Sequence, residues 1–133
     1  MNALYTKAKQ RFLTGSMDWL TDQFRVVLVD KTGYIANLTS DEYLISIPVE
    51  ARTATSDVLT GKQAVNGVAS ADNIVIPSVT GQVDAIVIYK DTGSDATSPL
   101  LAFIDTSMGL PILLNNGDFN IQWNLGAARI FSL

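Results

Sequence analysis

The sequence predicts a mainly β fold: an antiparallel two-sheet sandwich or jelly roll with one N-terminal α-helix. From Ala51 onward, short runs rich in Thr and Val alternate with Gly, Asn, Asp and Pro at intervals of about ten residues, which is typical of sandwiches and barrels. An apolar stripe with helical spacing stands near the N-terminus. Of the 133 residues, 47% are hydrophobic and 17% are charged. This length and apolar content are sufficient for one hydrophobic core. We therefore expect a single domain over residues 1–133, with a helix within 1–15 and a β domain over 24–133.

The helix is predicted from an apolar stripe. Leu4, Ala8 and Phe12 recur every four residues, with basic residues between them. This spacing predicts a helix over Ala3–Leu13 that ends near Gly15. We expect the stripe to be buried, because an exposed apolar face on a soluble chain favours aggregation.

Two elements follow the helix. Phe24–Asp30 is rich in β-branched residues and predicts a strand, and its few polar positions indicate that both of its faces are covered. A helical segment of one or two turns is predicted over Asp41–Ser46, because Thr39 or Ser40 can cap it and Pro48 would stop it.

The remaining strands are short and are separated by turn-forming residues. They are predicted over Arg52–Leu59, Lys62–Val68, Asn73–Ile76, Val83–Lys90, Leu100–Asp105, Phe119–Trp123 and Arg129–Leu133. The steps Asn66-Gly67 and Asn116-Gly117 suit left-handed turn positions, although the first lies within a strand-like run, where it would mark a bulge or shorten the strand. The polar segment Asp91–Ser98 predicts a loop that faces solvent or a partner.

Composition argues against several function classes. The formal net charge is −4 with nine Lys and Arg residues, which suits phosphate backbones poorly, so we expect no nucleic-acid partner. The chain has no Cys and no His, and therefore lacks the thiolate nucleophile and the commonest general base and metal ligand. We expect no cofactor and no metal. Apolar runs are short and basic residues interrupt the N-terminal segment, so we expect neither a membrane span nor a standard export signal.

The sharpest catalytic candidate is Asp91-Thr92-Gly93-Ser94. It follows the apolar run Ile86–Tyr89, and a strand that leads into Asp-Thr-Gly resembles the catalytic loop of retroviral-type aspartic proteases, where two carboxylates share one proton. Lys90 stands where that family has an apolar residue, and Ile112–Leu114 is followed by Asn115 instead of Gly. Both departures favour an ordinary hairpin turn. We therefore predict a protein that is not an enzyme, with the protease as a distant alternative.

Other polar and aromatic residues also favour structural roles. Asp91 and Asp95 could both bind calcium, but the further carboxylates of a calcium loop are missing. Asp41, Glu42 and Glu50 suggest paired catalytic acids, but the helix dipole already explains acids in a first turn. The aromatic residues are more simply core or interface material than a ligand platform.

Stretches spread along nearly the whole chain carry a family resemblance. They are Ala3–Lys9 leading to Phe12-Leu13, Asp18–Asp22, Val26–Asp30, Ile47-Pro48, Ala51-Arg52, Leu59–Lys62, Ile88–Asp95, Gly109–Pro111 and Ile121–Trp123. Taken together, they resemble a family of small virion proteins encoded by tailed bacteriophages and prophages. The resemblance explains Asp-Thr-Gly as part of a family loop, and it implies a structural component of the phage particle.

Within such a particle, we expect a capsid decoration or cement protein that stabilises the head by bridging major capsid proteins. Proteins of this kind are commonly small cysteine-free β-sandwiches or jelly rolls, present in many copies in virions that assemble in the host cytoplasm. A tail, head-tail connector or baseplate component is the alternative within this class, and a carbohydrate-binding module of the virion is another. The expected partners are the major capsid protein and further copies of the chain in a homo-oligomer. The candidate interface residues are Leu4, Ala8, Phe12, Asp91 and Asp95.

Overall fold

The predicted fold class is confirmed. The computed structural model describes residues 2–105, 110–123 and 130–132. Strands hold 44% of the chain and helices 12%, so the protein is mainly β, and its sheets are antiparallel with a single α-helix near the N-terminus. Two layers of strands give it a sandwich-like arrangement.

A five-stranded sheet forms the centre of the molecule. Its strand order is β1 (Asn2–Leu4), β8 (Leu100–Ile104), β7 (Ala85–Lys90), β2 (Phe24–Val29) and β3 (Arg52–Thr55). Every neighbouring pair is antiparallel. All five residues of β8 are buried, as are five of six in both β2 and β7, and these three strands make most of the core. Continuous apolar runs of this kind occur where both faces of a sheet are covered.

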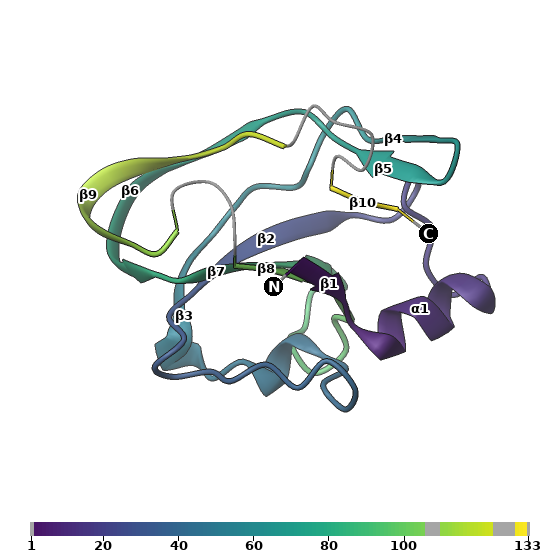
Figure 1. Cartoon of the computed structure of the whole chain (residues 1–133), viewed down its shortest axis with the longest axis horizontal. Helices are drawn as coiled ribbons and strands as arrows, with labels where there is room; N and C mark the ends of the chain where they lie inside the picture. Colours follow the sequence, from purple (N-terminus) through teal and green to yellow (C-terminus); the bar gives the residue numbers. More distant parts are fainter. Residues whose placement is uncertain (1, 106–109, 124–129, 133) are drawn as a thin grey trace.

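Both faces of the central sheet are covered, as expected for the Phe24–Asp30 segment. One face carries the ribbon β6 (Ile74–Val83) with β9 (Ile112–Ile121) and the small sheet β10 (Phe131–Ser132), β5 (Val68–Ser70) and β4 (Gln63–Val65) (Figure 1). The other face carries α1 (Thr6–Leu13) and the short 3-10 helices η1 (Leu44–Ser46) and η2 (Val49–Ala51) (Figure 1).

The predicted helix over Ala3–Leu13 is wrong at its start. Asn2–Leu4 form β1, in which Leu4 pairs with Ala102, and the helix begins only at Thr6. Without β1, the N–H and C=O groups on this edge of β8 would have no strand partner. Hydrogen bonds from Asn2–Leu4 to these groups stabilise the fold more than an additional helical turn would.

The expected end of the helix near Gly15 is confirmed. Gly15 has a φ of 73°, and its N–H bonds the carbonyl of Phe12 while the N–H of Ser16 bonds that of Arg11. This is a Schellman motif, which glycine favours because it has no Cβ. Burial of the stripe is confirmed for Ala8, which has no exposed surface, whereas Leu4 and Phe12 are only partly buried.

The predicted helical segment over Asp41–Ser46 is confirmed only for its last three residues. It is reduced to the three-residue η1, because the carboxylate of Asp41 bonds the N–H of Asn37 and the hydroxyl of Tyr34. A side chain that bonds a loop in this way competes with helix formation.

The strands that follow differ from the sequence prediction in length. The run Lys62–Val68 is split into β4 and β5 by a tight turn at Asn66-Gly67, both with positive φ, as that step suggested. Asn116 is left-handed but makes no hairpin turn, since it lies inside β9 where the pairing with β6 is irregular. Arg129 and Leu133, the bounds of the last predicted strand, lie outside the described residues.

The ribbon formed by β6 and β9 also differs in length from the sequence prediction. Asn73–Ile76 and Phe119–Trp123 predict short strands, whereas β6 and β9 each hold ten residues. Their pairing continues through two register shifts. Within the described residues, no helix is long and apolar enough to cross a membrane.

Candidate functional site

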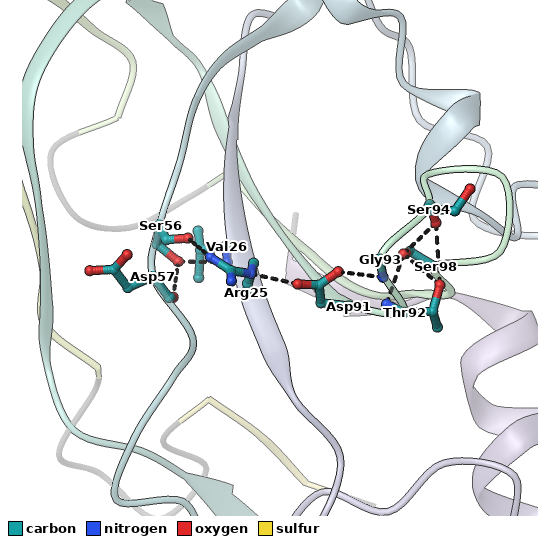
Figure 2. Close-up of polar contacts among 9 residues, drawn as sticks. All are labelled: Arg25, Val26, Ser56, Asp57, Asp91, Thr92, Gly93, Ser94 and Ser98. Carbon is teal, nitrogen blue, oxygen red and sulfur yellow. Dashed lines mark hydrogen bonds and ion pairs between the residues drawn. The ribbon is translucent and has the colours of Figure 1, made fainter.

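The loop over residues 91–98 joins β7 to β8 and is the first candidate site. The carboxylate of Asp91 accepts a 2.6 Å hydrogen bond from Nε of Arg25 and a 2.9 Å bond from the N–H of Gly93 (Figure 2). The N–H of Asp91 bonds the carbonyl of Gln23. Asp91 therefore anchors the start of the loop to the beginning of the neighbouring strand β2.

Arg25 is itself fixed by a second element. Its Nη1 donates to the carbonyl of Ser56, and the hydroxyl of Ser56 accepts the N–H of Val26 and donates to the carbonyl of Asp57 (Figure 2). The guanidinium thus bridges the loop to the segment that follows β3. An arginine held by two partners in this way has few alternative rotamers.

The environment of Asp91 keeps its carboxylate ionised. The N–H of Gly93, followed by the guanidinium of Arg25, lowers the pKa of Asp91. In an aspartic protease two neighbouring carboxyl groups share one proton, whereas the partner of Asp91 is the guanidinium of Arg25. The neighbouring Lys90 forms an ion pair with Asp22 at 3.2 Å, so it is also fixed in a structural contact.

Hydroxyl groups close the rest of the loop on itself. The hydroxyl of buried Ser98 donates to the carbonyl of Ser94 at 2.7 Å and accepts the N–H of Thr92 (Figure 2). The hydroxyls of Thr92 and Thr97 lie 2.6 Å apart. The exposed top of the loop is consequently a small, neutral and internally bonded surface.

A second arginine fixes the middle of the loop. Arg52 donates to the carboxylate of Asp95 at 3.3 Å and to the carbonyls of Leu44 and Ile47. The carbonyl of Asp95 accepts the N–H of Ile45, whose side chain is 56% exposed. The loop and the 3-10 helix η1 thus form one surface, which we call the loop surface: residues 91–98 together with Ile45.

The sequence-predicted site residues fall in two separate groups. Asp91 and Asp95 belong to one loop, but each carboxylate has its own arginine, so they do not converge as calcium ligands would. Among the described residues, no three acidic side chains come together as a metal-ion site. Leu4, Ala8 and Phe12 belong to β1 and α1 instead.

Phe12 leads to a feature that sequence reasoning missed. Its ring lies 5.9 Å from that of Phe131, and both line an apolar hollow of about 320 Å³ between the end of α1 and the small sheet. Trp19 and Ala64 also line this hollow. Nothing in the local sequence places these four residues together, because Ala64 and Phe131 are distant in sequence from each other and from Phe12 and Trp19.

Arg25 and Arg52 were missed for a different reason. Each is a lone cation in a strand-like run of the sequence, and such a residue needs a partner wherever the strand is buried. That requirement was a usable signal, although only the fold identifies Asp91 and Asp95 as the partners. Comparison with known proteins adds no assignment: no protein-family model matches the chain, and no curated protein matches it.

Proposed function

We propose that this protein is a structural component of a bacteriophage virion, a capsid decoration or cement protein that bridges major capsid proteins and stabilises the head. The resemblance to small phage virion proteins extends over nearly the whole chain and supports this proposal. The mainly β, antiparallel fold with one N-terminal helix agrees with the architecture expected for such proteins.

The observation that carries the proposal is the clamping of the loop surface by two arginines. Arg25 holds its start, Arg52 holds its middle, and internal hydroxyl bonds hold the rest. A surface held in one shape before contact loses little conformational entropy on binding. The exposed side chain of Ile45 adds apolar area to a polar rim, which is the usual anatomy of a protein interface.

The same clamping supports a binding role over catalysis. The carboxylate of Asp91 accepts hydrogen bonds from Nε of Arg25 and the N–H of Gly93, so it is engaged in holding the loop and has a cation, not a second carboxyl group, as its partner. A protease that used this residue would have to break the contact that positions its own loop. The proposal therefore assigns Asp91 a positioning role.

Quantified gels of purified phage particles test the location of the protein. A decoration protein is expected at a copy number of the same order as the major capsid protein, since it repeats with the capsid lattice. A copy number that follows a small ring or spike would reject the decoration role and favour a tail, connector or baseplate component.

A variant of the loop tests the surface itself. Ala96 is exposed at the loop, and Ala96→Arg places a large cation on it without touching either clamp. We expect binding to purified capsids to weaken about tenfold or more while the unfolding midpoint stays unchanged. Asn120→Arg, at an exposed position on β9, is the matched control and should bind normally. Equal binding by both variants would exclude the loop surface as the contact.

A further inference from the structure

The β4–β5 hairpin combines an open strand edge with the apolar hollow. β4 is the last strand of the small sheet, so within the described residues its outer edge pairs with no other strand. The hollow lies beside it and is lined mainly by Phe12, Met17, Trp19, Ala64, Ala69 and Phe131. An open edge next to an apolar hollow is the arrangement used to bind extended peptides, in which main-chain bonds supply affinity and a pocket supplies specificity.

The hollow results from the register of the small sheet. Ala64 lies opposite Ala69, and Ala69 lies opposite Phe131, so the three residues form one row across the strands. Residues directly opposite in antiparallel strands share a face. The ring of Phe131 packs edge-on against Trp19 at 5.3 Å, whereas the short side chains of Ala64 and Ala69 line the hollow beside it.

The backbone of β4 is oriented to accept another strand. The turn at Asn66-Gly67 has two residues, so the flanking pair Val65 and Val68 exchanges hydrogen bonds and the next pair does not. The N–H and C=O of Ala64 therefore point away from β5, toward the open side. The carbonyl of Ala69 points the opposite way and accepts the N–H of Ile130, as this alternation requires.

We propose that this edge binds an extended segment of a partner protein, antiparallel to β4, with a large apolar side chain opposite Ala64 that fills the hollow. The partner residue would exchange two main-chain bonds with Ala64 and would lie on the same face as the row of alanines. This inference does not depend on the proposed virion role, because binding can be measured on the purified chain alone.

A second copy of the chain does not suit the site. Consider two β4 strands from two copies that pair antiparallel about a twofold axis. Only residues whose main-chain groups point outward can exchange hydrogen bonds, and these are Ala64 and every second residue from it. The residue opposite Ala64 would therefore be Lys62, Ala64 or Asn66 in the nearest registers. None of these has a large apolar side chain. Asp18 lines the hollow and accepts the N–H groups of Leu20 and Thr21. Its negative charge suits a segment with Lys or Arg two positions from the apolar residue, because residues two apart in a strand lie on the same face.

The test is a titration of the isotope-labelled full chain with a synthetic peptide, acetyl-Lys-Thr-Phe-Thr-Lys-amide, followed by NMR. We expect saturable shifts at the amides of Ala64 and Ala69 and at the indole N–H of Trp19, which bonds the carbonyls of Gln63 and Ser70. A control peptide with Ala in place of Phe should bind about tenfold more weakly, because it leaves the hollow empty.

Three protein variants separate the two parts of the site. Ala64→Pro removes the outward N–H, a change that an edge strand tolerates, and should weaken binding of the Phe peptide about tenfold. Ala69→Leu places a side chain in the hollow and should make the two peptides bind equally. Leu113→Ala removes an exposed side chain of β9 outside the hollow and should change nothing.

Several results would overturn the proposal. Equal binding of the two peptides by the unaltered chain excludes the hollow as a side-chain pocket, and shifts centred on another strand edge exclude β4. A concentration-dependent dimer that Ala64→Pro abolishes, measured by sedimentation, would assign the edge to a second copy of the chain.

Discussion

Replacement of Asp91 by Asn tests the clamp between Arg25 and the loop. Asn keeps an acceptor for the N–H of Gly93 but loses the charge that bonds Nε of Arg25 at 2.6 Å. The side chains of Arg25 and Asp91 are 32% and 23% exposed, so the pair lies between a surface ion pair, at about 0.2–1 kcal/mol, and a buried charged hydrogen bond, at about 1.5–3 kcal/mol. We expect Asp91→Asn to lower the free energy of unfolding by about 1–2 kcal/mol, whereas an ordinary turn aspartate would cost about 1 kcal/mol or less.

The pH dependence supplies an independent check of this clamp. Folding lowers the pKa of Asp91 below its ordinary value of 3.8, so the pair stabilises the fold above about pH 4 and this stabilisation is lost as pH falls through the folded-state pKa. The Asn side chain does not titrate. The difference between the two proteins should therefore be constant from about pH 7 to pH 5 and shrink below about pH 4.

Urea unfolding at several pH values, followed by tryptophan fluorescence, measures both effects. Asp95→Asn is the matched control, because Asp95 pairs with Arg52 at 3.3 Å and is 39% exposed, and we expect it to cost about 0.5 kcal/mol. The reasoning fails if Asp91→Asn costs less than Asp95→Asn at neutral pH, or if its effect grows in acid.

Three further substitutions test the core and the turns by the same unfolding assay. Gly61→Ala should destabilise by about 1–2 kcal/mol, because Gly61 has a φ of 62° and the added Cβ would also displace the exposed carboxyl group of Asp72; a neutral result would contradict the strain expected at this φ. Tyr34→Phe should cost about 1–3 kcal/mol, since it leaves the buried hydroxyl of Tyr5 without its 2.8 Å partner, and a loss below about 0.5 kcal/mol would refute that role. Ile88→Ala, at a fully buried position in β7, should cost about 2–5 kcal/mol, and a smaller loss would mean that the site collapses around the cavity.

The sequence predicts elements well where one local signal dominates. β2, β7 and β8 are found at nearly their predicted bounds because each is a continuous run of buried apolar residues. The end of α1 is also correct, since Gly15 provides the left-handed residue that closes the helix.

Local signals fail where a distant strand decides the conformation. Leu4 has helical spacing with Ala8, yet it pairs with Ala102 in the sheet. The ribbon β6–β9 extends through Ser78 and Asn116, both with positive φ, which read locally as strand ends. In each case long-range pairing overrides local preference.

The candidate site likewise has a part that the local sequence predicts and a part that depends on contacts between distant residues. The polar loop over residues 91–98 is visible in the sequence, because Ala96 is its only apolar residue and it contains turn formers. Its two clamps are not visible, since Arg25 lies 66 residues from Asp91 and Arg52 lies 43 residues from Asp95. The apolar hollow beside Trp19 is equally hidden, because it depends on the register of Ala64 with Ala69.

The pairing of β1 with β8 determines the order in which the chain can complete its fold during synthesis. Ala3 leaves the ribosome before its partner Phe103, which emerges about 100 residues later. Until β8 has been made, β1 has no strand to pair with, and residues 2–4 cannot reach their final positions. Contacts so distant in sequence slow folding, because a long loop must close before any bond repays the lost entropy. The helix α1 has only eight residues and is too short to be stable from local contacts alone, so it also becomes stable only when it can pack against β8.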